Sequence, residues 1–107
     1  MAIAIDSEDG QVFANPADRA RRRLSALSPQ IAELRQRLLV LDEQITFLSQ
    51  VAADAQTDAV VTENPSVTRE HQGALRDVAR ARRERDEVAK AVADHLAEQD
   101  RLLDSLL

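Results

Sequence analysis

The sequence contains no cysteine, tryptophan or tyrosine, and only two phenylalanines, two glycines and three prolines among 107 residues. Without cysteine, disulfide bonds, thiolate nucleophiles and cysteine metal sites are excluded. A β-sandwich or a doubly wound α/β domain needs frequent turn residues and β-branched or aromatic strands, and neither is supplied here. These absences favour an all-α chain, and a hydrophobic content of 44% is sufficient for one small domain.

Long apolar runs and a surplus of positive charge are also missing. No stretch approaches the ~18 to 20 consecutive apolar residues of a membrane span, and the N-terminus lacks the basic start and apolar run of a signal peptide. The chain has 19 acidic and 14 basic residues and a formal net charge of −5, which weighs against general binding to nucleic acids or anionic membranes. We therefore expect a soluble, cytoplasmic protein that binds neither.

A heptad repeat of apolar residues dominates the first half of the chain. Asn15 and Pro16 supply an N-cap and a first helical residue, and Asp18 places a carboxylate in the first turn. Beyond them, apolar residues alternate at spacings of three and four without interruption, and Pro29 falls opposite this stripe. We predict a helix over residues 15–55, with a kink or re-capped joint at Pro29. The stripe consists of Leu24, Leu27, Ile31, Leu34, Leu38, Leu41, Ile45, Leu48, Ala52 and Ala55.

A loop over residues 56–66 and a second helix over 67–107 are predicted next. The segment 56–66 is polar at both ends and contains Asn64-Pro65, a pair that disfavours helix at the asparagine. Ser66 or Thr68 can cap the helix that follows. The stripe of this second helix is more polar. We assign to it Leu75, Val78, Ala81 or Arg82, Arg85, Val88 or Ala89, Val92, Leu96, Gln99, Leu102 or Leu103, and Leu106.

Opposite charges meet when the second helix folds back onto the first. The cluster Arg19, Arg21, Arg22 and Arg23 then lies beside Glu98, Asp100 and Asp104. Arg85 falls in the seam opposite Leu38, where Asp42 is its candidate partner and the pair would fix the register. We predict an antiparallel two-helix coiled-coil hairpin. The alternative is a parallel dimer through the first helix, whose flanking positions offer essentially one good charge pair, Arg37 with Asp42.

Residues 1–14 form a separate N-terminal arm. Two short apolar runs flank a polar turn that ends at Gly10, a pattern that fits a β-hairpin or an extended segment. The arm either lies on the helices, adds to a strand edge of a partner, or is a mobile tail. Its apolar residues are Ile3, Ile5, Val12 and Phe13.

Residues with catalytic or ligand-binding chemistry are sparse. His71 and His95 are separated by roughly six or seven helical turns, and neither has a metal-ligand spacing around it. There is no glycine-rich phosphate loop and no serine with a histidine beside it in the hairpin. The arginine-rich run 80–87 fits a solvated face with Arg80–Glu84, Arg82–Asp86 and Arg83–Glu87 pairs. We expect no enzymatic activity, no cofactor and no metal.

A second apolar face on the first helix indicates the function. It occupies heptad positions b, c and g, which a two-helix hairpin leaves uncovered unless the arm folds over them. We therefore predict a non-enzymatic coiled-coil interaction protein, a self-associating assembly or adaptor subunit in a homo-oligomer or a helical hetero-complex. The alternative is a regulator that sequesters a transcription factor or other helical partner through Leu39, Val40 and Phe47. The whole face comprises Ala32, Leu39, Val40, Phe47 and Val51.

Overall fold

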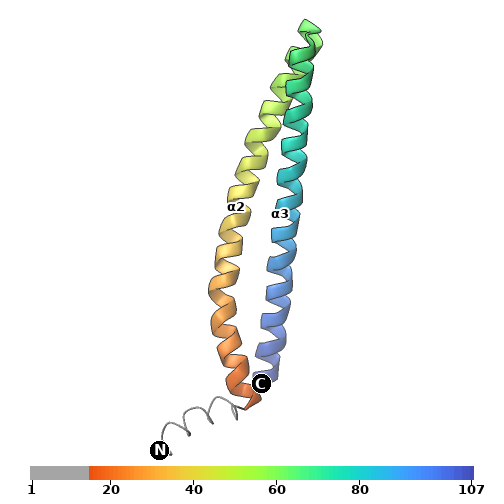
Figure 1. Cartoon of the computed structure of the whole chain (residues 1–107). Helices are drawn as coiled ribbons and strands as arrows, with labels where there is room; N and C mark the ends of the chain where they lie inside the picture. Colours follow the sequence, from red (N-terminus) through yellow and green to blue (C-terminus); the bar gives the residue numbers. More distant parts are fainter. Residues whose placement is uncertain (1–14) are drawn as a thin grey trace, which may run out of the picture. The chain divides into compact units, whose positions relative to one another are not determined.

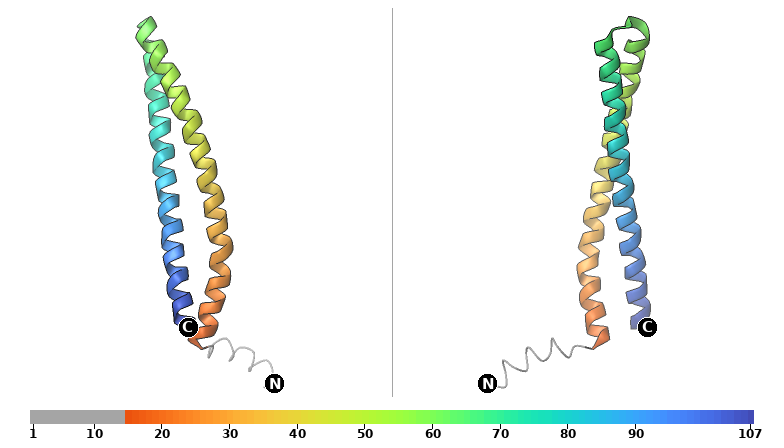
Figure 2. Two further views of the ribbon diagram at one scale, coloured as in Figure 1. Left: turned by 180° about the vertical axis from the view of Figure 1, so that it is seen from behind. Right: turned by 45° about the vertical axis from the view of Figure 1, so that its right-hand side comes forward.

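Two long α-helices make up the part of the chain that the computed structural model describes, residues 15–107 (Figure 1). Helix α2 spans Pro16–Thr62 and helix α3 spans Pro65–Leu106. The helices pack against each other as a hairpin, and two further views show α3 returning alongside α2 (Figure 2). The all-α helical hairpin is therefore confirmed. The predicted arm, with its possible β-hairpin, lies outside the described residues.

The hairpin divides into two compact units. One, which we call the turn unit, is the continuous segment Glu33–Val92. The other, the terminal unit, combines Ala93–Leu107 with the described part of Met1–Ala32. Both helices contribute to each unit, so each has its own piece of the seam between α2 and α3.

Helix α2 begins where the sequence predicts. The side-chain Oδ1 of Asn15 accepts a hydrogen bond of 2.8 Å from the backbone N–H of Asp18, and the carbonyl of Asn15 accepts one of 3.2 Å from Arg19 N–H. Asn15 is thus an N-cap that satisfies an otherwise unpaired helix donor. Pro29 is exposed, and α2 continues through it without a break.

The predicted loop over residues 56–66 is wrong, because α2 extends to Thr62 and only two residues separate the helices. The polar residues of this segment are compatible with helix, since the hydroxyls of Thr57 and Thr62 donate to carbonyls four residues back, at 3.1 and 2.8 Å. Glu63, the first residue after α2, has a φ of 52°, the left-handed conformation that commonly terminates a helix.

Helix α3 starts at Pro65, earlier than the predicted residue 67, and its N-cap is Asn64 rather than Ser66 or Thr68. The Oδ1 of Asn64 accepts a hydrogen bond of 2.9 Å from Ser66 N–H, and its carbonyl accepts one of 3.1 Å from Thr68 N–H. Proline at the first helical position needs no N–H partner. Asn64-Pro65 therefore begins α3 in the same way that Asn15-Pro16 begins α2.

The heptad stripe of α2 is the inner side of that helix, as predicted. All ten of its positions are buried or half-buried. Leu27 in the terminal unit and Leu41 in the turn unit have no exposed surface. Ala52 forms a core cluster with Ala74 and Val78, against which Leu48 packs. Burial at every third and fourth residue is the geometry of a coiled-coil seam.

The seam of α3 differs from the predicted one near its start. Leu75 is 49% exposed, whereas the neighbouring Ala74 is buried. Ala81, not Arg82, is the buried member of its pair. His71 and His95 are half-buried and fit the same alternation of three and four as Ala74 and Ala81. The helix thus follows a regular spacing even where that spacing places a small or polar residue inside.

Candidate interaction surface

An exposed apolar face on α2 is the most distinctive surface of the turn unit. Leu39, Val40, Phe47 and Val51 are 59%, 43%, 68% and 38% exposed, respectively. Leu39, Val40 and Phe47 occupy the predicted heptad positions b and c, on the side of α2 away from α3, and Val51 at position g lies between them and the seam. We call these four residues the α2 outer face. Ala32 is also exposed, but it belongs to the terminal unit.

Exposed acidic residues flank the α2 outer face at both ends, and two arginines border its start, Arg35 one turn before Leu39 and Arg37, which binds Glu84, one turn before Val40. Glu33, Glu43, Asp54 and Asp58 are all exposed and share its side of the helix. Two of them, Glu33 and Asp54, stand seven residues before Val40 and seven residues after Phe47. This face therefore combines an apolar centre with negative ends.

Arg85 pairs with Asp42, the partner proposed for it from the sequence. Its Nε donates a hydrogen bond of 3.2 Å to Asp42 Oδ1, and its Nη1 donates one of 2.8 Å to Asp86 Oδ1. The hydrogen bonds to Asp86 and Asp42 raise the pKa of Arg85. The side chain is 45% exposed, so its charged end reaches solvent at the edge of the seam. The role of this pair in fixing the register remains a prediction.

Two further ion pairs join the helices. In the terminal unit, Arg23 binds Glu98 through two hydrogen bonds of 2.7 and 2.9 Å. These bonds from Arg23 hold the pKa of Glu98 below its ordinary value, and the charges of His95 and Arg101 lower it further. In the turn unit, Arg37 binds Glu84. Opposite charges therefore meet across the seam in both units.

The ion pairs in the arginine-rich run differ from the predicted ones. Glu84 binds Arg37 of α2, and Asp86 binds the adjacent Arg85. Arg80 lies 3.6 Å from Asp77, one turn earlier in α3. Glu84 and Asp86 are thus engaged by arginines other than Arg80 and Arg82, because cross-seam and neighbouring partners compete with the pairs along α3.

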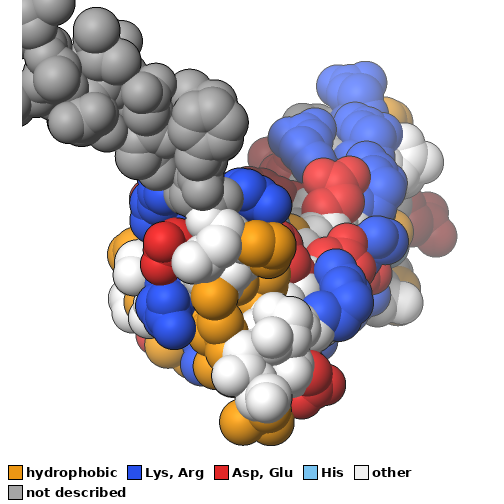
Figure 3. All heavy atoms as spheres, turned by 90° about the horizontal axis from the view of Figure 1, so that it is seen from below, with side chains coloured by type: hydrophobic (Ala, Val, Ile, Leu, Met, Phe, Trp, Pro, Cys, Tyr) orange, Lys and Arg blue, Asp and Glu red, His pale blue; other side chains and the backbone are white. Residues whose placement is uncertain are grey.

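The sequence interpretation missed a row of cations on α3. Arg69, Arg76, Arg83 and Lys90 are all exposed and stand seven residues apart. The seam positions of α3 leave this row on the side away from α2, and we call it the α3 outer row. Its heptad spacing is visible in the sequence, but which side it occupies follows only once the seam is known. On the surface viewed from below, basic and acidic side chains are interspersed (Figure 3).

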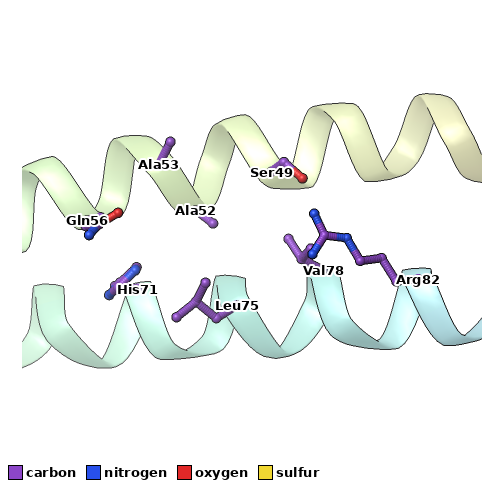
Figure 4. Close-up of a pocket in the computed structure, with 8 residues that line it drawn as sticks. All are labelled: Ser49, Ala52, Ala53, Gln56, His71, Leu75, Val78 and Arg82. Atoms are coloured by element: carbon purple, nitrogen blue, oxygen red, sulfur yellow. The ribbon is translucent and has the colours of Figure 1, made fainter.

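An open groove of the turn unit shows no catalytic arrangement among the described residues. Figure 4 shows Ser49 and Gln56 of α2 and His71 and Arg82 of α3 along this groove. Ser49 and His71 lie at different levels, with Ala52 between them. Within residues 15–107, no group of three or more acidic or histidine side chains could hold a metal ion, and neither helix is long and apolar enough to cross a membrane.

No protein-family model, curated protein or solved structure matches this chain. The surfaces of the two helices are therefore the basis for a proposed function.

Proposed function

We propose that this protein is a non-enzymatic coiled-coil subunit that associates with further copies of itself through the α2 outer face. The observation that carries the proposal is the exposure of Leu39, Val40, Phe47 and Val51 on one side of one helix. Contiguous exposed apolar side chains of this kind mark protein interfaces more often than they serve a free monomer.

The α2 outer face is not needed to hold the hairpin together. The seam already buries Leu27, Leu41 and the cluster around Ala52. Covering a Leu or Phe side chain that is otherwise in water contributes ~1.5 to 3 kcal/mol, so a second subunit seated on Leu39 and Phe47 would gain substantially. The seam is thus sufficient to stabilise the hairpin, and the α2 outer face remains available for the proposed association with a second copy.

Light scattering on the Phe47→Glu variant tests the proposal. The wild-type chain should have a mass above the 11.9 kDa of one chain, and the substitution should lower it because a charge replaces the most exposed aromatic side chain of the face. Interface aromatics usually cost ~2 kcal/mol or more when lost, which is visible at micromolar concentration. Circular dichroism should show unchanged helicity.

Leu103→Glu is the matched control, since Leu103 is 48% exposed but lies on α3 in the terminal unit. That variant should keep the wild-type mass. A wild-type protein that is monomeric at all concentrations, or a Phe47→Glu variant of wild-type mass, would contradict the proposal.

A further inference from the structure

We propose that the α2 outer face of one copy binds the α3 outer row of the next copy, so that copies associate side by side in an open series. This inference rests on the proposed function, because it names the surface that the second copy presents. It follows from the charge and the spacing of two rows of exposed residues, both within the turn unit.

The row on α2 reads acid, apolar, apolar, acid. Glu33, Val40, Phe47 and Asp54 stand seven residues apart, or about 10.5 Å at ~1.5 Å per residue. Two such faces placed against each other would bring acidic residues together, and Glu43 and Asp58 would add to the repulsion. The face therefore fits a cationic surface better than it fits a second copy of itself.

The row on α3 supplies cations at the same spacing. Arg69, Arg76, Arg83 and Lys90 span the same number of residues as the row on α2, and all four are exposed. Within residues 15–107, Arg69, Arg76 and Arg83 take part in none of the salt bridges, and the predicted pair of Arg83 with Glu87 is not among them. These three arginines of the row thus carry charge that no salt bridge of the described residues neutralises.

The two rows also lie at matching levels of the hairpin. In an antiparallel hairpin, residues at the same level have numbers with a constant sum. The two rows fulfil this condition at all four levels: Glu33 with Lys90, Val40 with Arg83, Phe47 with Arg76, and Asp54 with Arg69. The intrachain pair of Arg37 and Glu84 departs from that sum by only two. A second copy displaced sideways, without sliding along the helices, therefore brings the rows into register.

The contacts expected in this arrangement suit the residues at each level. Opposite charges meet at both ends, where Glu33 and Asp54 face cations. At the centre, arginine side chains can lay their apolar stems on Val40 and their planar guanidinium groups on the ring of Phe47. Charge at the ends and stacking at the centre together specify the partner face.

The proposed contact is heterologous, because it joins two different surfaces. Each copy added leaves one α2 outer face and one α3 outer row uncovered at the ends of the series. An interface of this kind that is not closed by rotation gives an open assembly rather than a dimer. The mass of the wild-type protein should therefore rise with concentration without reaching a plateau.

A mixing experiment distinguishes this arrangement from other modes of association. Phe47→Glu blocks the α2 outer face and keeps the α3 outer row, whereas Arg76→Glu/Arg83→Glu does the reverse. Each variant alone should be monomeric by analytical ultracentrifugation. An equimolar mixture should form a dimer of twice the monomer mass, because each variant retains the face that the other lacks.

The controls separate charge from folding. Arg22→Glu/Arg82→Glu carries the same charge change at two exposed arginines outside the row, and it should keep the wild-type mass. If Arg76→Glu/Arg83→Glu loses helicity, Arg76→Ala/Arg83→Ala replaces it, since alanine has the highest helix propensity. Raising the ionic strength to about 1 M, where the Debye length is about 3 Å, should weaken wild-type association.

Three results would overturn the inference. If the α3 variant associates as strongly as the wild type while Phe47→Glu is monomeric, the α2 faces pair with one another, and the proposed function survives. If the wild type is monomeric at all concentrations, both proposals fail. If a short DNA duplex binds the wild type and not the α3 variant, while the masses of the two proteins are equal, the row is a nucleic-acid surface instead.

Discussion

The inner sides of α2 and α3 form one seam but consist of different kinds of residues. The inner side of α2 is apolar at every heptad position from Leu24 to Ala55, whereas the inner side of α3 includes His71, Arg85 and His95. Yet both sides follow an alternation of three and four. The comparison shows that spacing defines the seam in both helices, and that hydrophobicity marks it clearly in only one.

The outer sides of the two helices are also unlike each other. In the turn unit, α2 exposes apolar and acidic residues, and α3 exposes cations at heptad intervals. A helix that packs against one partner only requires polar residues on its outer side, and these residues need no heptad spacing. The heptad order on both outer sides is the basis for the proposed side-by-side association.

The largest expected effect tests the difference between the two seams. Leu41→Ala should destabilise the protein by about 3 kcal/mol, within the ~2 to 5 kcal/mol that buried Leu→Ala changes cost. Leu75→Ala should change stability by less than ~0.5 kcal/mol, because Leu75 is 49% exposed and lies outside the seam. Urea unfolding followed by circular dichroism measures both, at a protein concentration where the midpoint is constant. Equal losses would place Leu75 inside the seam and overturn the register of α3.

An effect of intermediate size compares the starts of the two helices. Asn15→Ala and Asn64→Ala should each cost ~1 kcal/mol, the usual loss when an N-cap side chain is removed. Asn64→Asp is the control, because aspartate keeps an oxygen that can accept the hydrogen bond from Ser66. If Asn64→Ala is neutral in urea unfolding while Asn15→Ala is not, Asn64 is a loop residue rather than a cap.

Much of the fold could be predicted because the sequence of α2 contains clear local patterns. Its start at Asn15 and its apolar seam follow from local patterns, whereas α2 continues through Pro29 as one helix, without the re-capped joint that is one of the two outcomes predicted there. The connection was mispredicted because Asn64-Pro65 was interpreted as a helix breaker, although the same pair at Asn15 was interpreted as a helix start. Asn64-Pro65 both disfavours continuation of α2 and begins α3. The sequence does not show how close the end of α2 lies to the start of α3, and the packed structure does.

The candidate surface was predictable in part for the same reason. An apolar face at positions b, c and g of α2 can be recognised once a and d are assigned, so Leu39, Val40 and Phe47 were found from the sequence. The α3 outer row was missed because the predicted inner side of α3 began at Leu75 instead of Ala74, and because Arg83 was assigned to Glu87 of the same helix. Cross-seam pairing of Glu84 with Arg37 is a tertiary contact that no local spacing reveals.

The smallest expected effect concerns the ion pair that joins the helices in the terminal unit. Hydrogen bonds from Arg23 hold the pKa of Glu98 below its ordinary value. The unfolded chain therefore takes up a proton at a higher pH than the folded one, so the stabilisation is fully present above the ordinary glutamate pKa of ~4.3 and is lost as the pH falls through the lower folded-state pKa. Both side chains are partly exposed, which keeps the effect small.

Thermal unfolding of the wild type and of Glu98→Gln between about pH 7 and pH 3 checks this prediction. The melting temperature of the wild type should exceed that of the variant at neutral pH, and the difference should shrink as the pH falls through the lowered pKa of Glu98 in the folded protein. Asp100→Asn removes an equal charge from an exposed carboxylate that takes part in none of the salt bridges of residues 15–107, so it should show no comparable convergence. A difference that stayed constant down to the lowest pH would mean that Glu98 stabilises α3 by helix propensity or packing, and that the bond to Arg23 contributes nothing to joining the two helices.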